Sequence, residues 1–195
     1  YWATSLAWAG GDTIYMIQGN GTNNFGGYSI AADQWFSLAD YPGFVRRAGH
    51  SLIWPGQGGY LYCCEGNGTG TFERYDIADD MWESLADIPT RMWHGSSIAW
   101  GGGTTIYAAA DTLAFYSYDI GTDTWTPRAA YPEALDLGAW MTYDGDELLF
   151  LCRGDTTATV WRYDIRGDVW ETIEDAPAEI AAGASTITDP FFRDD

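Results

Sequence analysis

Two residue types that often carry out acid–base or nucleophilic chemistry, Lys and His, are absent or scarce in this chain of 195 residues. There is no Lys, because all nine basic residues are Arg, and the only two His are His50 and His94. The absence of Lys excludes Schiff-base chemistry and phosphate binding by a P-loop lysine. His50 lies four residues before Trp54, whereas His94 lies six before Trp100, so the two imidazoles do not share a register. No Ser–His–Asp arrangement follows from the spacing, and we predict no catalytic residue.

The three Cys do not indicate a metal site or a disulfide framework. Cys63 and Cys64 are adjacent, and adjacent residues of a strand point to opposite faces. The two His lack the spacing that zinc sites use. We therefore expect no metal and no cofactor, and we interpret Cys64 and Cys152 as small buried apolar residues.

The charge balance is strongly acidic, with 28 Asp and Glu against nine basic residues and a net charge of −19. Such a surface repels nucleic acids and anionic membranes, and no apolar run is long enough for membrane insertion. Dense carboxylates suit strong salt, so the composition favours a halophilic source, with an acidic extracellular protein as the alternative. Two Asn-Gly-Thr sequons make Asn20 and Asn67 glycosylation candidates, although Asn-Gly is also a favoured turn pair. We expect an extracellular or cell-surface location.

A repeat of about 45 residues must position any site in this chain. Tyr, then Trp seven residues on, then Pro seven further, recur with steps of 47, 43 and 45 residues. The four copies are Tyr28/Trp35/Pro42, Tyr75/Trp82/Pro89, Tyr118/Trp125/Pro132 and Tyr163/Trp170/Pro177. We interpret these Tyr and Trp residues as structural repeat positions that fill the space between stacked sheets.

One repeat predicts four short strands joined by turns. In the second copy these are 51–54, 60–64, 71–77 and 81–85, which alternate in character and are separated by Gly, Pro and Asp. An Asp lies two residues before each repeated Trp, and we expect it to cap the hairpin turn through its side-chain oxygen. These residues are Asp33, Asp80, Asp123 and Asp168. The prediction is an all-β chain of repeated four-stranded antiparallel sheets, stacked radially as the blades of a β-propeller.

The unit resembles the kelch repeat, in the order Arg47-Ala-Gly-His-Ser51, Tyr75-Asp-Ile77, Trp82 and Pro89. The copies are divergent, because the paired glycines of that family are reduced to one Gly or to none. The resemblance implies a propeller, and some of its relatives are enzymes, including copper oxidases of sugars and sialic-acid epimerases. A copper site of that type needs two His and two Tyr, and the registers of His50 and His94 do not predict it.

The repeats define one kelch-type propeller domain over 1–195. Its units run over about 1–42, 43–89, 90–132 and 133–177, and 178–195 contains an extra first strand. Three arrangements stay open: a closed four-bladed ring, a segment of a larger propeller, or pairing of the spare strand with another subunit.

Residues that interrupt the repeat in or beside loops are the binding candidates, because packing explains the repeated ones. They are Arg46, Arg47, Arg91, Trp93, His94, Trp140 and Arg153. The Arg residues form either an anion contact or a balance for nearby Asp, and the Trp residues either stack on sugars or partners or add to packing.

The sequence favours a non-catalytic scaffold for protein–protein interaction or self-assembly. A carbohydrate-binding module and a small kelch-type enzyme acting on a sugar are the alternatives. The expected partners are a protein or a second copy, then carbohydrate, with no nucleic acid.

Overall fold

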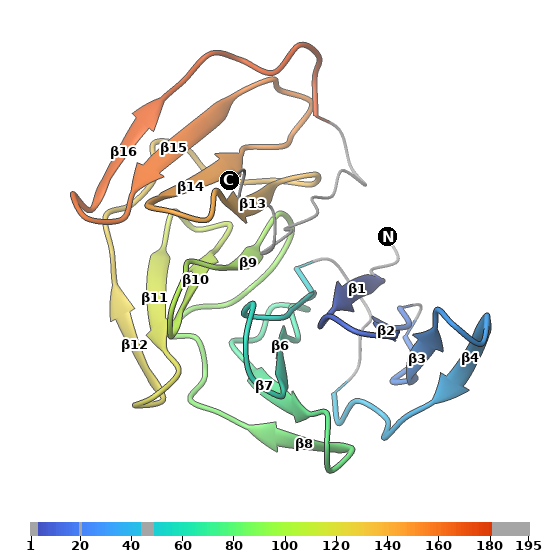
Figure 1. Cartoon of the computed structure of the whole chain (residues 1–195). Helices are drawn as coiled ribbons and strands as arrows, with labels where there is room; N and C mark the ends of the chain where they lie inside the picture. The colour runs from blue at the N-terminus through green and yellow to red at the C-terminus, as the bar shows by residue number, and fades with distance from the viewer. Residues whose placement is uncertain (1–3, 20, 44–48, 181–195) are drawn as a thin grey trace. The chain divides into compact units, whose positions relative to one another are not determined.

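The structure is a computed structural model that describes residues 4–19, 21–43 and 49–180. Within these residues the chain forms sixteen strands in four four-stranded antiparallel sheets and contains no helix (Figure 1). Hydrogen-bonded neighbours are consecutive in the sequence, so each sheet is a meander. The predicted all-β chain with four repeated sheets is therefore confirmed. A search of the same residues for a helix long and apolar enough to cross a membrane finds none.

The strands are three to five residues long and begin and end close to the positions that the repeat predicts. The first sheet holds β1 (Ser5–Trp8), β2 (Thr13–Ile17), β3 (Phe25–Ser29) and β4 (Gln34–Ser37), and the second holds β5 (Ser51–Ile53), β6 (Tyr60–Cys64), β7 (Phe72–Asp76) and β8 (Met81–Ser84). The third holds β9 (Ser97–Trp100), β10 (Thr105–Ala109), β11 (Phe115–Asp119) and β12 (Thr124–Pro127), and the fourth holds β13 (Trp140–Tyr143), β14 (Leu148–Cys152), β15 (Val160–Asp164) and β16 (Val169–Thr172).

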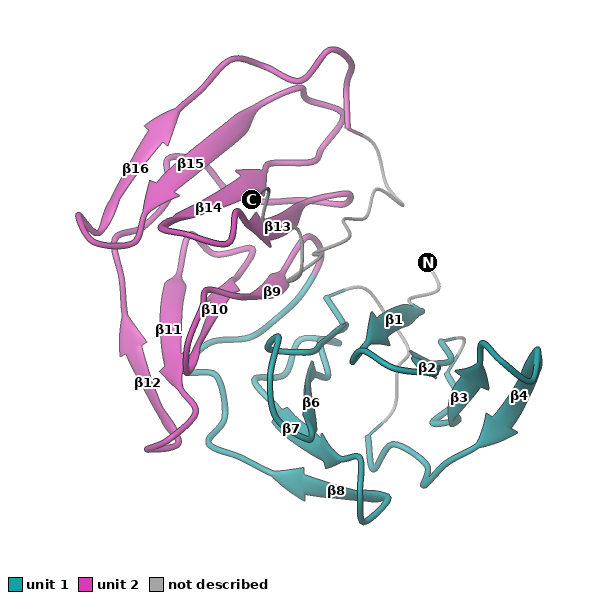
Figure 2. Ribbon diagram, viewed as in Figure 1, with its two compact units in different colours: residues 1–93 teal, residues 94–195 magenta. Residues whose placement is uncertain are grey.

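The chain divides into two compact units, residues 1–93 and 94–195, each with two sheets (Figure 2). In the first unit β1 lies against β5, and the Leu52 amide donates to Ser5 Oγ at 2.9 Å. In the second unit β9 lies against β13. Each unit thus contains one sheet-on-sheet interface. A single domain over 1–195 stays a prediction.

Apolar side chains from both sheets fill each interface, because alternate residues of a strand share a face. In the first unit Phe25 of the first sheet meets Tyr75 and Trp82 of the second, with ring centroids 4.6 and 5.0 Å apart. In the second unit Phe115 meets Tyr163 and Trp170 at 4.9 and 5.0 Å. The same aromatic interface is therefore built twice.

A hydrogen-bonded latch joins the two sheets of the first unit. Trp82 lies directly opposite Tyr75 in the β7–β8 hairpin, and its Nε1 donates to the Ala39 carbonyl at 3.0 Å. The Ala39 amide donates to Asp80 Oδ1 at 2.8 Å, and the Tyr75 hydroxyl donates to the same oxygen at 2.6 Å. Tyr, Asp and Trp of one hairpin thus hold the backbone of the loop that follows β4 in the other sheet.

The second unit repeats this latch with the β15–β16 hairpin. Trp170 Nε1 donates to the Ala129 carbonyl at 2.8 Å, and the Ala129 amide donates to Asp168 Oδ1 at 2.9 Å. The Tyr163 hydroxyl donates to Asp168 Oδ1. This hydrogen bond, and to a smaller extent the one from the Ala129 amide, lowers the pKa of Asp168 below its ordinary value. We call the three side chains of such a hairpin the Tyr–Asp–Trp latch.

The four repeated Trp residues do not share one environment, which corrects the expectation that each of them packs between two sheets. Trp82 and Trp170 take part in the interface of their own unit, whereas Trp35 is 55% exposed. Trp125 is half-buried and lies opposite Tyr118 in the β11–β12 hairpin, with ring centroids 4.9 Å apart.

The third sheet turns Trp125 away from the interface of the second unit. Tyr118 and Phe115 are three residues apart in β11, so they lie on opposite faces of the sheet, and Phe115 is the one that meets the fourth sheet. The Tyr118 hydroxyl donates to Asp123 Oδ1 at 2.7 Å, as in the two latches. Trp125 thus keeps the register and the ring contact of the repeat, but it does not join the two sheets of its unit.

Asp33, Asp80 and Asp168 accept from a Tyr hydroxyl or from the backbone of a neighbouring sheet and not from the amides of their own turns, which corrects the capping expectation for these three residues. They take a left-handed backbone with φ of 50–54°, and Asp80 and Asp168 serve the latch. The turn amides are instead accepted by the residue after the repeated Tyr. In the second sheet Asp76 Oδ1 accepts from Ala78 and Asp79, and in the first sheet Ser29 Oγ accepts from Ala32. The expectation identified the correct side-chain chemistry but not the residue that supplies it.

The Asp carboxylate of a latch that binds the backbone of another sheet should contribute to the free energy of unfolding. We expect Asp168→Ala to lower the free energy of unfolding by about 2 to 3 kcal/mol, because it leaves the buried Tyr163 hydroxyl and the Ala129 amide without their acceptor. Asp33→Ala is the matched control, since Asp33 has the same backbone but accepts from the half-exposed Tyr28. Urea unfolding of both variants measures the difference. Equal losses would contradict a sheet-joining role for Asp168.

Candidate functional site

The predicted loop residues lie in both units, with Arg91 and Trp93 in the first and His94, Trp140 and Arg153 in the second. Arg46, Arg47 and Asn20 lie outside the described residues. Arg91 is exposed in the segment after the second sheet, and His94 is half-buried in the turn before β9. Trp140 begins β13 and pairs with Cys152, the residue before Arg153, so Trp140 and Arg153 lie at the same end of the fourth sheet.

Local contacts account for three of these candidates. Arg153 forms ion pairs with Glu133, Nε to Oε2 at 3.3 Å, and with Asp155, Nη2 to Oδ2 at 3.6 Å, which matches the charge-balance interpretation. Trp93 packs its ring over Gly68, where an added Cβ would meet ring carbons at 2.7 Å. Asn67 has φ of 55° in the β6–β7 loop, as a turn residue does.

A buried polar cluster in the first unit was not predicted. It consists of Tyr41, Cys63 and Glu73, which are buried, and of His50, which is half-buried; Tyr41 and Cys63 belong to the core between the first and second sheets. Cys63 Sγ lies 3.3 Å from His50 Nε2, and the Tyr41 and His50 ring centroids are 6.1 Å apart. Glu73 is only 5% exposed. We call these four residues the buried polar cluster.

Burial controls the protonation of the cluster. It lowers the pKa of His50 to about 4, so the imidazole is neutral at pH 7. It raises the pKa of the Cys63 thiol well above its ordinary value, with the neighbouring Cys64 and Glu73 adding to the shift. Burial, and secondarily Glu65 and Asp87, raise the pKa of Glu73. Each group thus favours its neutral form.

This protonation does not suit nucleophilic chemistry, because the thiolate is the reactive form of Cys. Among the described residues, no group of three or more His, Cys, Asp or Glu is arranged to hold a metal ion. Comparison within the repeat is the signal that would have found the cluster. Glu73, Cys63 and His50 stand where the fourth sheet has Trp161, Leu151 and Ala139. The second unit is apolar at these positions, with Tyr131 stacked on Trp161 at 6.1 Å.

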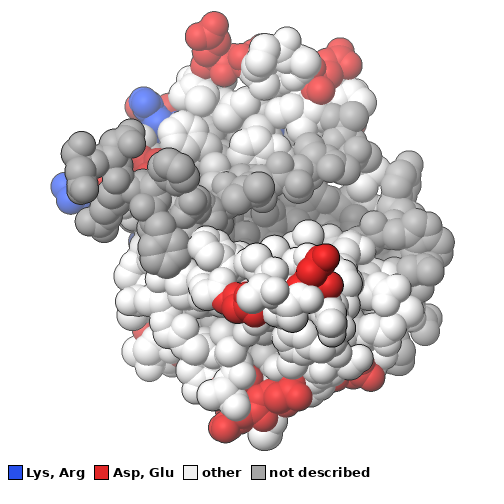
Figure 3. Space-filling model, turned by 45° about the vertical axis from the view of Figure 1, so that its right-hand side comes forward, with Lys and Arg blue, Asp and Glu red and all other residues white. Residues whose placement is uncertain are grey.

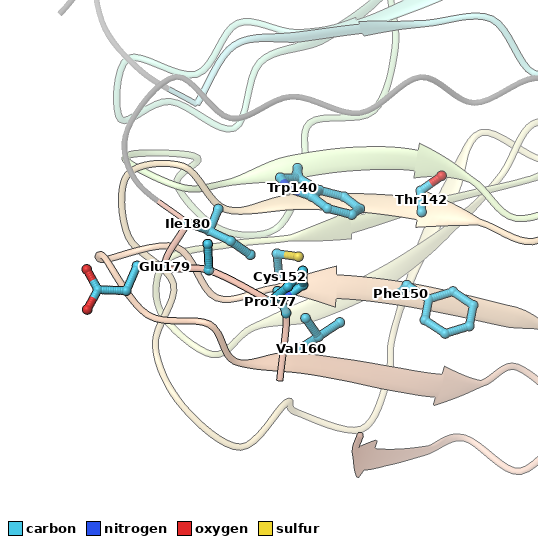
Figure 4. Close-up of a pocket in the computed structure, with 10 residues that line it drawn as sticks. Trp140, Thr142, Phe150, Cys152, Val160, Pro177, Glu179 and Ile180 are labelled. Atoms are coloured by element: carbon cyan, nitrogen blue, oxygen red, sulfur yellow. The ribbon is translucent and has the colours of Figure 1, made fainter. Parts of the chain in front are cut away.

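The fourth sheet has an open hollow of about 580 Å³ on the face opposite the third sheet. It is lined by Trp140, Thr142, Phe150, Cys152, Val160 and the segment 176–180, and we call it the fourth-sheet hollow. Apolar groups dominate this lining, and Figure 4 shows the Glu179 carboxylate pointing away from the other side chains. Among the predicted binding residues that the structure describes, Trp140 is the one that lines it.

The first sheet also has an open face, on the side opposite the second sheet. It carries Leu6, Trp8, Met16, Tyr28 and Trp35, whose positions across the sheet place them on one side. Leu6 is 58% exposed and Trp35 is 55% exposed. This open face of the first sheet has the repeated Tyr and Trp in their usual register, with ring centroids 5.2 Å apart.

Acidic side chains are scattered over the face that Figure 3 draws. On the face that Figure 3 draws, Asp and Glu lie in several separate groups, with few basic side chains between them. Large uncharged areas separate these groups. The net charge of −19 is therefore compatible with uncharged contact surfaces.

Comparisons with known proteins define a fold and not an activity. No family model matches the chain, and no curated protein matches it. Among solved structures, the one titled "Structure of YjhT" is similar with a TM-score of 0.73 at 16% identity, over 94% of this chain and 68% of that one. This likeness shows that the chain shares the fold of that protein. The structure thus defines an all-β protein of repeated four-stranded antiparallel sheets.

Proposed function

We propose that this chain is a kelch-type β-propeller, or part of one, that acts as a non-catalytic scaffold binding other protein surfaces. The repeat of Tyr, Trp and Pro, the four meander sheets and the likeness to a solved structure over 94% of the chain support this proposal. The acidic composition supports a high-salt, extracellular or cell-surface setting.

The observation that carries the proposal is the open face of the first sheet. Large apolar side chains at the surface of a monomer mark interaction sites when they lie together. Leu6 and Trp35 are more than half exposed and share this face, which carries no Lys or Arg. A face of this chemistry fits the apolar surface of another protein.

The rival functions have weaker support. Sugar binding needs polar groups that accept and donate hydrogen bonds around an aromatic platform. The fourth-sheet hollow has Trp140, but Thr142 is its one polar lining side chain besides the outward-pointing Glu179. A sugar-active enzyme needs an accessible acid, base or metal, whereas the buried polar cluster has raised pKa values for Glu73 and Cys63 and a neutral His50.

A photo-crosslinking residue at Leu6 tests the scaffold function. We expect it to crosslink to protein, a second copy or another chain, in an extract of the source organism. The same residue at Ser84, which is exposed on β8 and lies outside the open face, is the matched control. A glycan array with specific hits, together with equal crosslinking at both positions, would replace the scaffold by a carbohydrate-binding function.

A further inference from the structure

The open face of the first sheet and the fourth-sheet hollow resemble the two sides of the sheet-on-sheet interface that each unit contains. In each unit, one sheet presents a Tyr–Asp–Trp latch and the other presents the face that receives it. In the first unit the receiving residues include Ala7, Tyr15, Ile17, Phe25 and Tyr41. A second copy of the inserting side lies on the open face of the first sheet, and a second copy of the receiving side is the fourth-sheet hollow. No other described sheet of the same unit covers either of these two surfaces.

The hollow corresponds to the receiving face residue by residue. Val160 begins β15 as Phe25 begins β3 and Phe115 begins β11. Ala176 precedes Pro177 as Tyr41 precedes Pro42. Thr142, Phe150 and Cys152 occupy the strand positions of Ala7, Tyr15 and Ile17, and all five corresponding residues of the fourth sheet line the hollow.

The open face corresponds to the inserting half. Tyr28, Asp33 and Trp35 form a Tyr–Asp–Trp latch, in which the Tyr28 hydroxyl already donates to Asp33 Oδ1. Asp33 has φ of 54°, against 52° for Asp80 and 50° for Asp168 in the two engaged latches. The latch is thus preorganised, and Trp35 is 55% exposed.

The two halves also match in size. At the position of Tyr41 the hollow has the small Ala176, and it has Val160 in place of Phe25. The open face compensates at the neighbouring position, because Met16 stands where the second sheet has Cys63, the residue that lies beside Tyr41. The open face thus has a larger side chain at the position that corresponds to a smaller one in the hollow.

We infer that the fourth-sheet hollow binds the β3–β4 hairpin of a second copy of this chain. In this contact Trp35 Nε1 donates to the backbone carbonyl of Glu174, and the Glu174 amide donates to Asp33, as Ala39 and Ala129 do in the engaged latches. The interface is head-to-tail, so each copy uses its hairpin on one neighbour and its hollow on another. This inference rests on the proposed scaffold function and names its partner.

Two variants that each disable one half test the inference. Trp35→Ala removes the inserting side chain, and Val160→Arg places a charge in the hollow. Sedimentation equilibrium in molar KCl, where the repulsion between copies of net charge −19 is screened, measures the association. We expect wild-type association that rises with protein concentration, and at least about 30-fold weaker association for each variant alone.

Mixing the two variants is the decisive measurement. Trp35→Ala keeps an intact hollow and Val160→Arg keeps an intact hairpin. The mixture should therefore form a one-to-one heterodimer, whereas each variant by itself should stay largely monomeric. Phe36→Glu is the matched control, because Phe36 lies on the opposite face of β4 and the second and fourth sheets have Glu83 and Glu171 there. It should associate like the wild type.

The inference is overturned if the wild type is a monomer at every concentration in molar KCl, if association survives both variants, or if the mixture forms no heterodimer. Circular dichroism establishes that each variant is folded before it is scored. A monomer that still crosslinks from Leu6 to a different protein would overturn the second copy as partner but keep the scaffold function.

Discussion

Trp82→Ala and Trp170→Ala should each lower the free energy of unfolding by about 3 to 5 kcal/mol. Both indoles pack against a Phe and a Tyr of the neighbouring sheet, Trp82 with Phe25 and Tyr41 at 5.0 Å each. Truncation leaves a cavity and also removes the hydrogen bond to the Ala39 or Ala129 carbonyl. The loss is therefore larger than the transfer free energy of the ring alone.

Trp35→Ala is the control at the same position of the repeat. This substitution should lower the free energy of unfolding by no more than about 1 kcal/mol, because Trp35 is 55% exposed and its ring contact is with Tyr28 of its own sheet. Guanidinium unfolding at low protein concentration, where copies are separate, compares the three variants. If Trp35→Ala lowers the free energy of unfolding as much as Trp82→Ala does, an intramolecular contact buries Trp35, and the two Trp residues do not differ in burial.

The second large effect is a loss of stability in mild acid that depends on His50. Its pKa falls from 6.5 to about 4 on burial, so below pH 6.5 the unfolded chain binds a proton that the folded chain does not. The free energy of unfolding is therefore unaffected by His50 above pH 6.5 and falls as the pH drops towards 4. Protonation of His50 in the unfolded chain accounts for a loss of about 3 kcal/mol over this range.

His50→Gln should remove this dependence. The measurement is the difference in unfolding free energy between wild type and variant from pH 7 to pH 4, which should change by about 3 kcal/mol over that range. The difference isolates His50, because Glu73 titrates in both proteins and its raised pKa changes stability in the opposite direction. A difference that is constant with pH would show that His50 is not held neutral by burial.

Sequence reasoning succeeded where the signal is local and periodic. The repeated Tyr and Trp lie opposite one another in every sheet, because the turn between them holds a constant number of residues and therefore sets the register. The burial of Cys64 and Cys152 follows from the same alternation. The four-stranded meanders can therefore be predicted from the sequence.

The surroundings of the repeated Trp residues could not be predicted in the same way. Trp35, Trp82 and Trp125 occupy the same place in the repeat. Trp35 is exposed and Trp82 is latched to a neighbouring sheet, whereas Trp125 is half-buried on the face of its sheet that turns away from the fourth sheet. Equal spacing therefore predicts equal register but not equal burial.

The candidate sites also depend on tertiary contacts that the spacing of the repeat does not specify. The buried polar cluster draws Tyr41 and His50 from loops and Cys63 and Glu73 from two strands. Arg153 forms ion pairs with Glu133 and Asp155, which its spacing in the repeat did not specify. In each case the deciding contact is with a residue that spacing does not specify.

The amino-acid sequence by itself determined the strands, their register and the number of sheets, because side-chain alternation and turn chemistry act over a few residues. Tertiary structure alone decided which sheet faces are covered and which stay open. That outcome depends on contacts between residues some forty positions apart, such as Ala39 with Asp80, and a sheet face is buried only when another surface is placed against it.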